Sequence, residues 1–135
     1  MSKAINICMI DDDDIYQFTM KLSLKPLDDI GIVNFFNDGL AAIDYIKNHI
    51  DNPQKLPDII FLDINMPVMD GYQFIEEYRQ IKSKLDKNII IYMLSSSIDP
   101  VDVKKVKHID EVSDYLIKPV KQEVLKTIFK DFKEH

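Results

Sequence analysis

The chain has 135 residues, 46% apolar and 30% charged, with one cysteine, which is typical of a single folded domain without disulfides or a cysteine-based zinc site. Its net charge of −6 disfavours binding to nucleic acid or to an anionic membrane and favours a cation as a small ligand. Because it has neither a secretion signal nor the roughly 18 apolar residues that span a bilayer, we expect a single cytoplasmic domain over residues 1–135, with no membrane insertion and no output domain.

Short apolar runs alternate with segments in which apolar residues recur at helical spacing, a pattern that predicts alternating strands and helices. The first elements are a strand at Ile5–Ile10, a helix with Ile15, Phe18, Leu22 and Leu24, a strand at Ile32–Phe36, and a helix with Leu40, Ile43, Ile46 and Ile50. A strand at Ile59–Leu62 and a helix with Tyr72, Ile75, Tyr78 and Ile81 come next.

The remaining elements are a strand at Ile89–Leu94, a helix that begins at Asp99 and Pro100, a strand at Tyr115–Ile117 and a helix from Val120 to about Phe132. Asp99 suits an N-cap, and Pro100 suits the first turn of a helix. The strands are almost continuously apolar, as expected for parallel strands that are buried on both faces. Five strands alternating with five helices predict an α/β fold, a doubly wound five-stranded parallel sheet in a three-layer αβα sandwich.

Polar side chains follow the ends of four predicted strands. Asp11 and Asp12 follow the first strand, Asp63 the third, Ser95 the fourth and Lys118 the fifth. Ligands of open parallel sheets bind beyond the carboxyl ends of the strands, so we expect these side chains to share one site. Carboxylates suit a hard cation such as Mg²⁺, whereas a serine hydroxyl and a lysine suit phosphate oxygens. An aspartate can also accept a phosphoryl group itself.

Four segments, in this order, resemble the receiver domain of two-component response regulators. They are Ile10–Asp12, Phe61–Gly71, Met93–Ser96 and Tyr115–Pro119, and the resemblance extends from about Ile5 to Phe132. It implies the flavodoxin-like receiver fold with strand order 2-1-3-4-5. Each motif alone is weak, but the set, with each motif at a strand end, is specific.

The resemblance implies a phosphoacceptor and a metal site. Asp63 matches the residue that accepts the phosphoryl group. Asp12 matches a direct ligand of Mg²⁺, Asp11 a ligand that acts through a metal-bound water, and Asn65 the residue that offers its backbone carbonyl. The neighbouring Asp13 and Asp14 are expected to be a solvated helix start, stabilised by the positive end of the helix dipole.

The resemblance also implies residues that respond to phosphorylation. Ser95 matches the hydroxyl residue that binds a phosphoryl oxygen, and Lys118 the lysine that pairs with the phosphate. Tyr115 matches the aromatic switch residue, whose inward or outward rotamer reports phosphorylation. The bond between Lys118 and Pro119 is often cis in this family, which would direct the amine into the site.

The function implied by the resemblance is a phosphorylation switch. The phosphohistidine of a sensor kinase or of a phosphotransfer protein would donate its phosphoryl group to Asp63, and the product would alter a surface that binds an unknown downstream protein. Such a domain assists its own phosphorylation and dephosphorylation and is not an enzyme with a separate substrate. Direct binding to nucleic acid is not expected.

The segment from His108 to Asp114 lacks the glycine that the family often has before the fifth strand, so we expect a different loop there. This departure leaves open a second hypothesis, a receiver-like module that binds a partner without phosphorylation. A third hypothesis, a flavodoxin-like cofactor binder, has less support because the sequence has no phosphate-cradling glycine loop.

Overall fold

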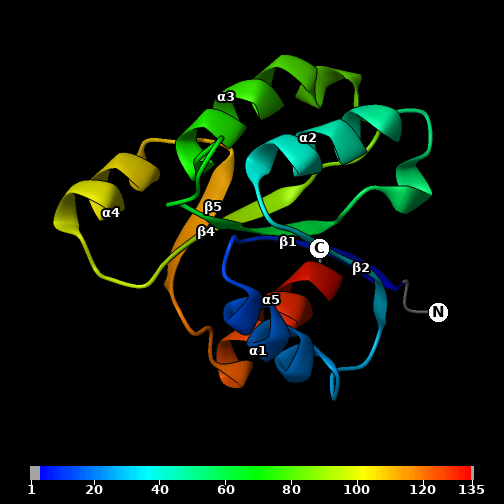
Figure 1. The fold of residues 1–135 in the computed structure, drawn as a ribbon. Helices are drawn as coiled ribbons and strands as arrows, with labels where there is room; N and C mark the ends of the chain where they lie inside the picture. Colours follow the sequence, from blue (N-terminus) through cyan, green and yellow to red (C-terminus); the bar gives the residue numbers. More distant parts are fainter. Residues whose placement is uncertain (1–3, 135) are drawn as a thin grey trace.

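The computed structural model describes residues 4–134 and contains one parallel sheet with helices on both faces (Figure 1). The strands are β1 (Ile5–Ile10), β2 (Ile30–Phe36), β3 (Ile59–Asp63), β4 (Ile90–Ser95) and β5 (Val112–Ile117). Their order is β2-β1-β3-β4-β5, and all four neighbouring pairs are parallel. The predicted fold class and strand order are confirmed. The order changes direction beside β1 and β3, which is where ligands bind in such sheets.

Five helices cover the sheet, and Figure 1 shows α1 and α5 on one face and α2, α3 and α4 on the other. They are α1 (Asp14–Leu24), α2 (Gly39–Asn48), α3 (Gly71–Ile81), α4 (Pro100–Lys107) and α5 (Gln122–Lys133), with short 3-10 turns at Pro53–Lys55 and Lys82–Lys84. As predicted, Asp99 caps α4, where its side chain accepts a hydrogen bond from the Val101 amide. No helix within residues 4–134 is long and apolar enough to cross a bilayer.

The apolar runs of the central strands supply two cores, one on each side of the sheet. Along β3, Ile60 and Leu62 pack on the side of α2 and α3, whereas Ile59 and Phe61 pack on the side of α1 and α5. This two-sided burial explains why the strand sequence is continuously apolar. Cys8 is buried in the first of these cores, where burial raises the pKa of its thiol, so it is a core residue.

Some element boundaries differ from the prediction. β2 begins at Ile30 because that residue pairs with Ile5, and β5 begins at Val112, which pairs with Ile91. The early residues of β5 include exposed polar side chains, because β5 is an edge strand, and the apolar pattern could not reveal them. α5 begins at Gln122 and not at Val120, whose amide donates to the Tyr16 hydroxyl.

α1 buries a different face from the one that its apolar spacing indicated. Tyr16, Met20 and Leu24 are its buried residues. Three of the four apolar residues with helical spacing are exposed instead, Ile15 at 78%, Phe18 at 61% and Leu22 at 55%. Both sets have helical spacing, so periodicity alone could not decide between them.

The glycine-free connection between α4 and β5 is an ordinary tight turn. Within residues 4–134, a positive φ occurs only at Asp29 and Val68, so this turn needs no glycine. Glu111 links this turn to the end of α3 and to the 3-10 turn that follows, because it accepts hydrogen bonds from Arg79 Nε at 2.9 Å and Lys82 Nζ at 2.5 Å. The Lys82 hydrogen bond, opposed in part by burial and assisted by Arg79, lowers the pKa of Glu111 to about 2.

We predict that Glu111→Gln lowers the free energy of unfolding by roughly 1–3 kcal/mol near neutral pH, because two cationic partners lose their carboxylate. The folded-state pKa lies below the ordinary value of 4.5, so this contribution is present above pH 4.5 and is lost as the pH falls toward about 2. Urea unfolding across this range should show a shallower acid dependence in the variant.

The control is Glu76→Gln, since the Glu76 side chain is 72% exposed whereas that of Glu111 is 8% exposed. It should change stability by about 0.5 kcal/mol or less. An unchanged acid dependence in Glu111→Gln would show that the Glu111 contacts do not stabilise the fold.

Candidate functional site

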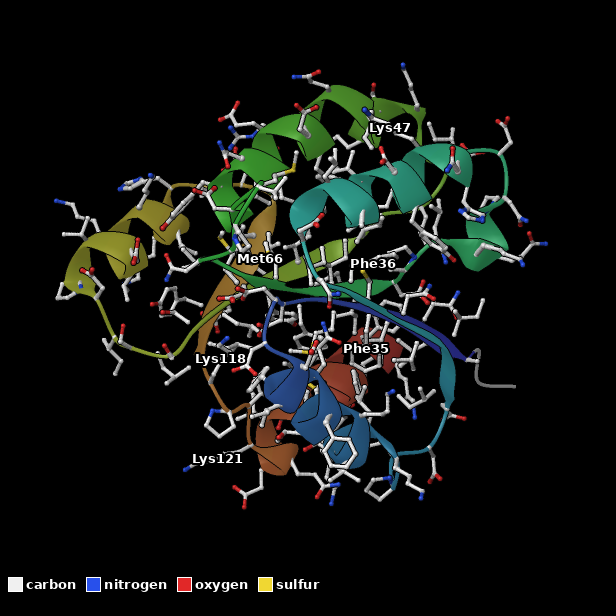
Figure 2. All side chains as sticks on the ribbon, viewed as in Figure 1. Phe35, Phe36, Lys47, Met66, Lys118 and Lys121 are labelled. Atoms are coloured by element: carbon white, nitrogen blue, oxygen red, sulfur yellow. The ribbon has the colours of Figure 1, made fainter. Side chains whose placement is uncertain are left out.

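Three carboxylates and one ammonium meet at the carboxyl edge of the sheet. Asp11 and Asp12 follow β1, Asp63 ends β3, and Lys118 follows β5. One carboxylate oxygen from each aspartate lies within 4.8 Å of the others. Figure 2 shows Lys118 at this edge, near α1. The structure therefore brings together the predicted acceptor, two further predicted metal ligands and the predicted lysine.

Lys118 lies between two buried carboxylates. Its Nζ is 2.8 Å from Asp11 Oδ2 and 3.4 Å from Asp63 Oδ2. Its backbone amide donates to the Ser95 carbonyl at 2.8 Å, which fixes the chain at the end of β5. The peptide bond between Lys118 and Pro119 is cis, as the resemblance implied.

The aspartates at the end of β1 have distinct environments. Asp11 is fully buried, and its second carboxylate oxygen accepts from the Asp13 amide at 2.9 Å. Asp12 is exposed to solvent. Asp13 is the N-cap of α1, and its side chain accepts from the amides of Ile15 and Tyr16. Asp13 and the exposed Asp14 therefore form the solvated helix start that the sequence predicted.

Asp63 is a buried carboxylate with an unusual proton affinity. Burial, followed by repulsion from Asp11, raises the pKa of Asp63 to about 6, although Lys118 acts in the opposite direction. Burial also works against the charged form of Lys118, but its hydrogen bonds and attraction to Asp11 and Asp63 outweigh this effect and raise the pKa of Lys118. The ammonium therefore stays charged beside the carboxylates.

The charges and donor atoms fit Mg²⁺. Three ionised carboxylates beside one ammonium leave an excess of two negative charges, which a divalent cation would neutralise. Carboxylate oxygens are preferred ligands of Mg²⁺, which keeps several of its waters. Asp11, Asp12 and Asp63 would supply these oxygens, and the exposed Asn65 lies two residues beyond Asp63, where its carbonyl remains a predicted ligand.

Ser95 and Tyr115 each form a hydrogen bond with Ser97, a residue of the loop between β4 and α4. Ser95 is buried at the end of β4, and its hydroxyl accepts from the Ser97 amide at 3.3 Å. The Tyr115 hydroxyl donates to the Ser97 carbonyl at 2.8 Å, and its ring is half-buried. Both predicted switch residues therefore contact the loop between β4 and α4.

The loop after Asp63 depends on two special backbone positions. A Cβ on Gly71 would lie 2.8 Å from the Asp63 carbonyl oxygen, so only glycine allows α3 to begin this close to β3. Val68 has a φ of 67°, which is uncommon for a β-branched residue, and the Met69 amide donates to the Pro67 carbonyl across it. The Asp-Gly motif in the sequence thus reflects close packing beside the acceptor.

Tyr16 also belongs to the site, although the sequence did not single it out. Its ring centroid is 4.7 Å from Lys118 Nζ, and its hydroxyl accepts from the Val120 amide at 3.0 Å. The sequence could not indicate this role, because the helical spacing of Ile15, Phe18 and Leu22 pointed to a different face of α1, which is exposed.

Residues 7–130 match the family model described as the response regulator receiver domain. The chain belongs to this family. The receiver is 29% identical to a two component response regulator from Cytophaga hutchinsonii, whose crystal structure it matches with a TM-score of 0.87 over 98% of this chain and 99% of that chain. It is 26% identical to the probable methanogenesis regulatory protein FilR2 of Methanothrix harundinacea, covering 96% of this chain and 81% of FilR2.

A third similar structure is a chain of the CheX–CheY–BeF₃–Mg²⁺ complex from Borrelia burgdorferi. It is 25% identical, with a TM-score of 0.76 over 96% of this receiver and 90% of that chain. The receiver spans 53% or less of the length of three further curated relatives, so their complete activities involve segments beyond the matched part.

We predict that Mg²⁺ stabilises the receiver and that Asp12→Ala abolishes the effect. Preferential binding to the folded state adds about 2.7 kcal/mol when the ion is present at about 100 times its dissociation constant. The melting temperature should therefore rise by several degrees with Mg²⁺, and thermal unfolding with and without the ion measures this rise. Asp14→Ala, at a nearby exposed carboxylate, should keep the full effect; equal loss in both variants would contradict a site at Asp12.

Proposed function

We propose that this receiver is a phosphorylation switch in which Asp63 takes a phosphoryl group from a phosphohistidine of a sensor kinase or phosphotransfer protein in the presence of Mg²⁺. The observation that carries the proposal is the position of the Lys118 ammonium between Asp11 and Asp63, within a set of three carboxylates. Family membership supports the same conclusion.

The hydrogen bonds favour Asp63 over Asp11 as the acceptor. Asp11 is fully buried, and its two oxygens are held at 2.8 Å by Lys118 and at 2.9 Å by the Asp13 amide. The contacts of Asp63 are longer, at 3.4 Å to Lys118 and 3.3 Å to the Asn65 amide. The hydrogen bonds of Asp63 are therefore weaker than those of Asp11, so an oxygen of Asp63 is more available to form a bond to phosphorus.

In the proposed reaction, an Asp63 oxygen forms a bond to phosphorus while the bond from phosphorus to the histidine nitrogen breaks, and the released imidazole is protonated from solvent. Phosphoryl transfer depends on positioning and on neutralising charge. Lys118 attracts the phosphoryl oxygens, and Mg²⁺ held by Asp11, Asp12 and Asp63 would supply the remaining charge neutralisation. Attack by water on the acyl phosphate releases inorganic phosphate, so the receiver resets itself and needs no separate substrate.

Exposed apolar side chains favour a protein as the donor. The segments that follow β1, β2, β3 and β4 each carry one, namely Ile15, Leu40, Val68 and Ile98. All four follow carboxyl ends of parallel strands, so they lie at the same end of the sheet as Asp63. Apolar side chains gathered on an exposed face are a feature of surfaces that bind proteins.

The proposed output passes through Ser97. Asp63 is in register with Leu94, next to Ser95, so a phosphoryl group on Asp63 offers new acceptor oxygens beside the Ser95 hydroxyl. A change in the Ser95 hydrogen bond alters the loop that also holds the Tyr115 hydroxyl. Tyr115 lines a groove of about 380 Å³ between α4 and β5, which would change shape with this loop. This groove is the proposed protein-interaction surface.

Incubation with phosphoramidate and Mg²⁺ tests the acceptor chemistry. We expect intact-mass spectrometry to show the addition of one phosphoryl group to the wild-type receiver and none to Asp63→Asn. Asp14→Asn, a matched change at an exposed carboxylate, should be phosphorylated normally. A phosphorylated histidine phosphotransfer protein in the same assay should transfer its group to the wild type only.

Two results would contradict the proposal. A wild-type receiver that gains no phosphoryl group lacks the acceptor chemistry, and a gain that survives Asp63→Asn places the acceptor elsewhere. Partner binding that is insensitive both to the phosphodonor and to Asp63→Asn would favour the receiver-like binding module instead.

A further inference from the structure

Tyr16 connects α1 to the segment that carries the essential lysine of the proposed reaction. It lies in the first turn of α1 and is 9% exposed, whereas the preceding Ile15 is 78% exposed. Its ring contacts the Lys118 ammonium at 4.7 Å from the centroid, and its hydroxyl accepts from the Val120 amide at 3.0 Å. One side chain therefore contacts the residues on both sides of Pro119.

We propose that Tyr16 is a positioning residue for phosphoryl transfer: its ring holds the Lys118 ammonium against Asp63, and its hydroxyl fixes the backbone at Val120. This inference rests on the proposed function of Asp63 and deepens it. Tyr16 acts through Lys118, whose ammonium faces both the Tyr16 ring and Asp63.

The Tyr16 ring is needed to position the Lys118 ammonium, because the two carboxylates that contact this ammonium hold it at unequal distances. Its contact with Asp11, at 2.8 Å, is shorter than its contact with Asp63, at 3.4 Å. A lysine ammonium is a point charge on a flexible four-carbon stem, so its position depends on what surrounds it. The face of an aromatic ring attracts a cation and adds a third support. Without the ring, Asp11 becomes the principal support, and the ammonium is less well placed for the phosphoryl oxygens.

The hydroxyl acts on the backbone. Val120 is buried and precedes α5, and its amide would otherwise lack the intrahelical partner that later residues have. The Tyr16 hydroxyl supplies that partner and so fixes the position of the chain two residues after Lys118. Burial raises the pKa of Tyr16, which keeps the hydroxyl neutral beside the carboxylates.

The kinetic test compares Tyr16→Leu, which removes the ring and the hydroxyl, with Tyr16→Phe, which removes only the hydroxyl. With phosphoramidate and saturating Mg²⁺, we expect Tyr16→Leu to be phosphorylated about ten-fold more slowly and Tyr16→Phe about two-fold more slowly. Tyr45→Leu is the control: it removes a tyrosine of α2 that donates to the Lys55 carbonyl, and it should leave the rate unchanged.

A double-mutant cycle separates positioning from a general structural role. If Tyr16 acts through Lys118, Tyr16→Leu has no further effect on the rate in a Lys118→Ala background. The same slowing in both backgrounds, or no slowing in the wild-type background, would overturn the inference. The affinity for Mg²⁺, which the carboxylates determine, should change by less than about two-fold in Tyr16→Leu.

An NMR measurement makes the test independent of phosphorylation. The ε-methylene signals of Lys118 should carry a ring-current shift in the wild type and in Tyr16→Phe, and should lose it in Tyr16→Leu. Unchanged Lys118 signals in a folded Tyr16→Leu would overturn the inference. If Tyr16→Leu does not fold, Tyr16→Phe provides the test, because it should shift the Val120 amide signal and retain the Lys118 signals.

The two proposals can fail separately. A wild type that takes no phosphoryl group would refute the proposed function, whereas the NMR result would still report how Tyr16 positions Lys118.

Discussion

The ammonium of Lys118, held between the carboxylates of Asp11 and Asp63, is the interaction on which the rest of the site depends. Two carboxylates buried side by side repel each other, and burial of each one is costly. One ammonium offsets part of this cost and leaves an excess of negative charge at the sheet edge. This excess of negative charge suits a divalent cation, and the cation together with Lys118 would offset the negative charge of a phosphoryl group.

The parallel sheet creates this arrangement by placing strand ends together. Asp11 and Asp63 come from the adjacent strands β1 and β3, at the point where the strand order changes direction, and Lys118 arrives from the far edge strand. Close packing then restricts the surrounding chain: Gly71 lets α3 begin against the Asp63 carbonyl, and Tyr16 meets Lys118 from α1. The site is therefore a property of the whole sheet and not of one loop.

The sequence predicted the fold and the meeting of Asp11, Asp12, Asp63 and Lys118 at one sheet edge, because strand ends can be located from apolar runs and parallel topology brings these ends together. It could not choose the buried face of α1, since Tyr16 and Phe18 belong to two sets with equal helical spacing. The ion pairs of Glu111 with Arg79 and Lys82 could not be predicted either, because they join side chains that are distant in the sequence. The start of β5 was missed because Ser113 and Asp114, which follow Val112, are polar and exposed, as an edge strand allows.

The most direct test of the central claim is a crystal structure of the receiver with Mg²⁺ and beryllofluoride, a tetrahedral mimic of a phosphoryl group. We predict that beryllofluoride bonds to an oxygen of Asp63, that Lys118 Nζ lies within hydrogen-bonding distance of a fluorine, and that the Tyr16 ring still contacts the ammonium. Beryllofluoride bound to a different carboxylate, or a Lys118 that remains paired with Asp11 alone, would contradict it.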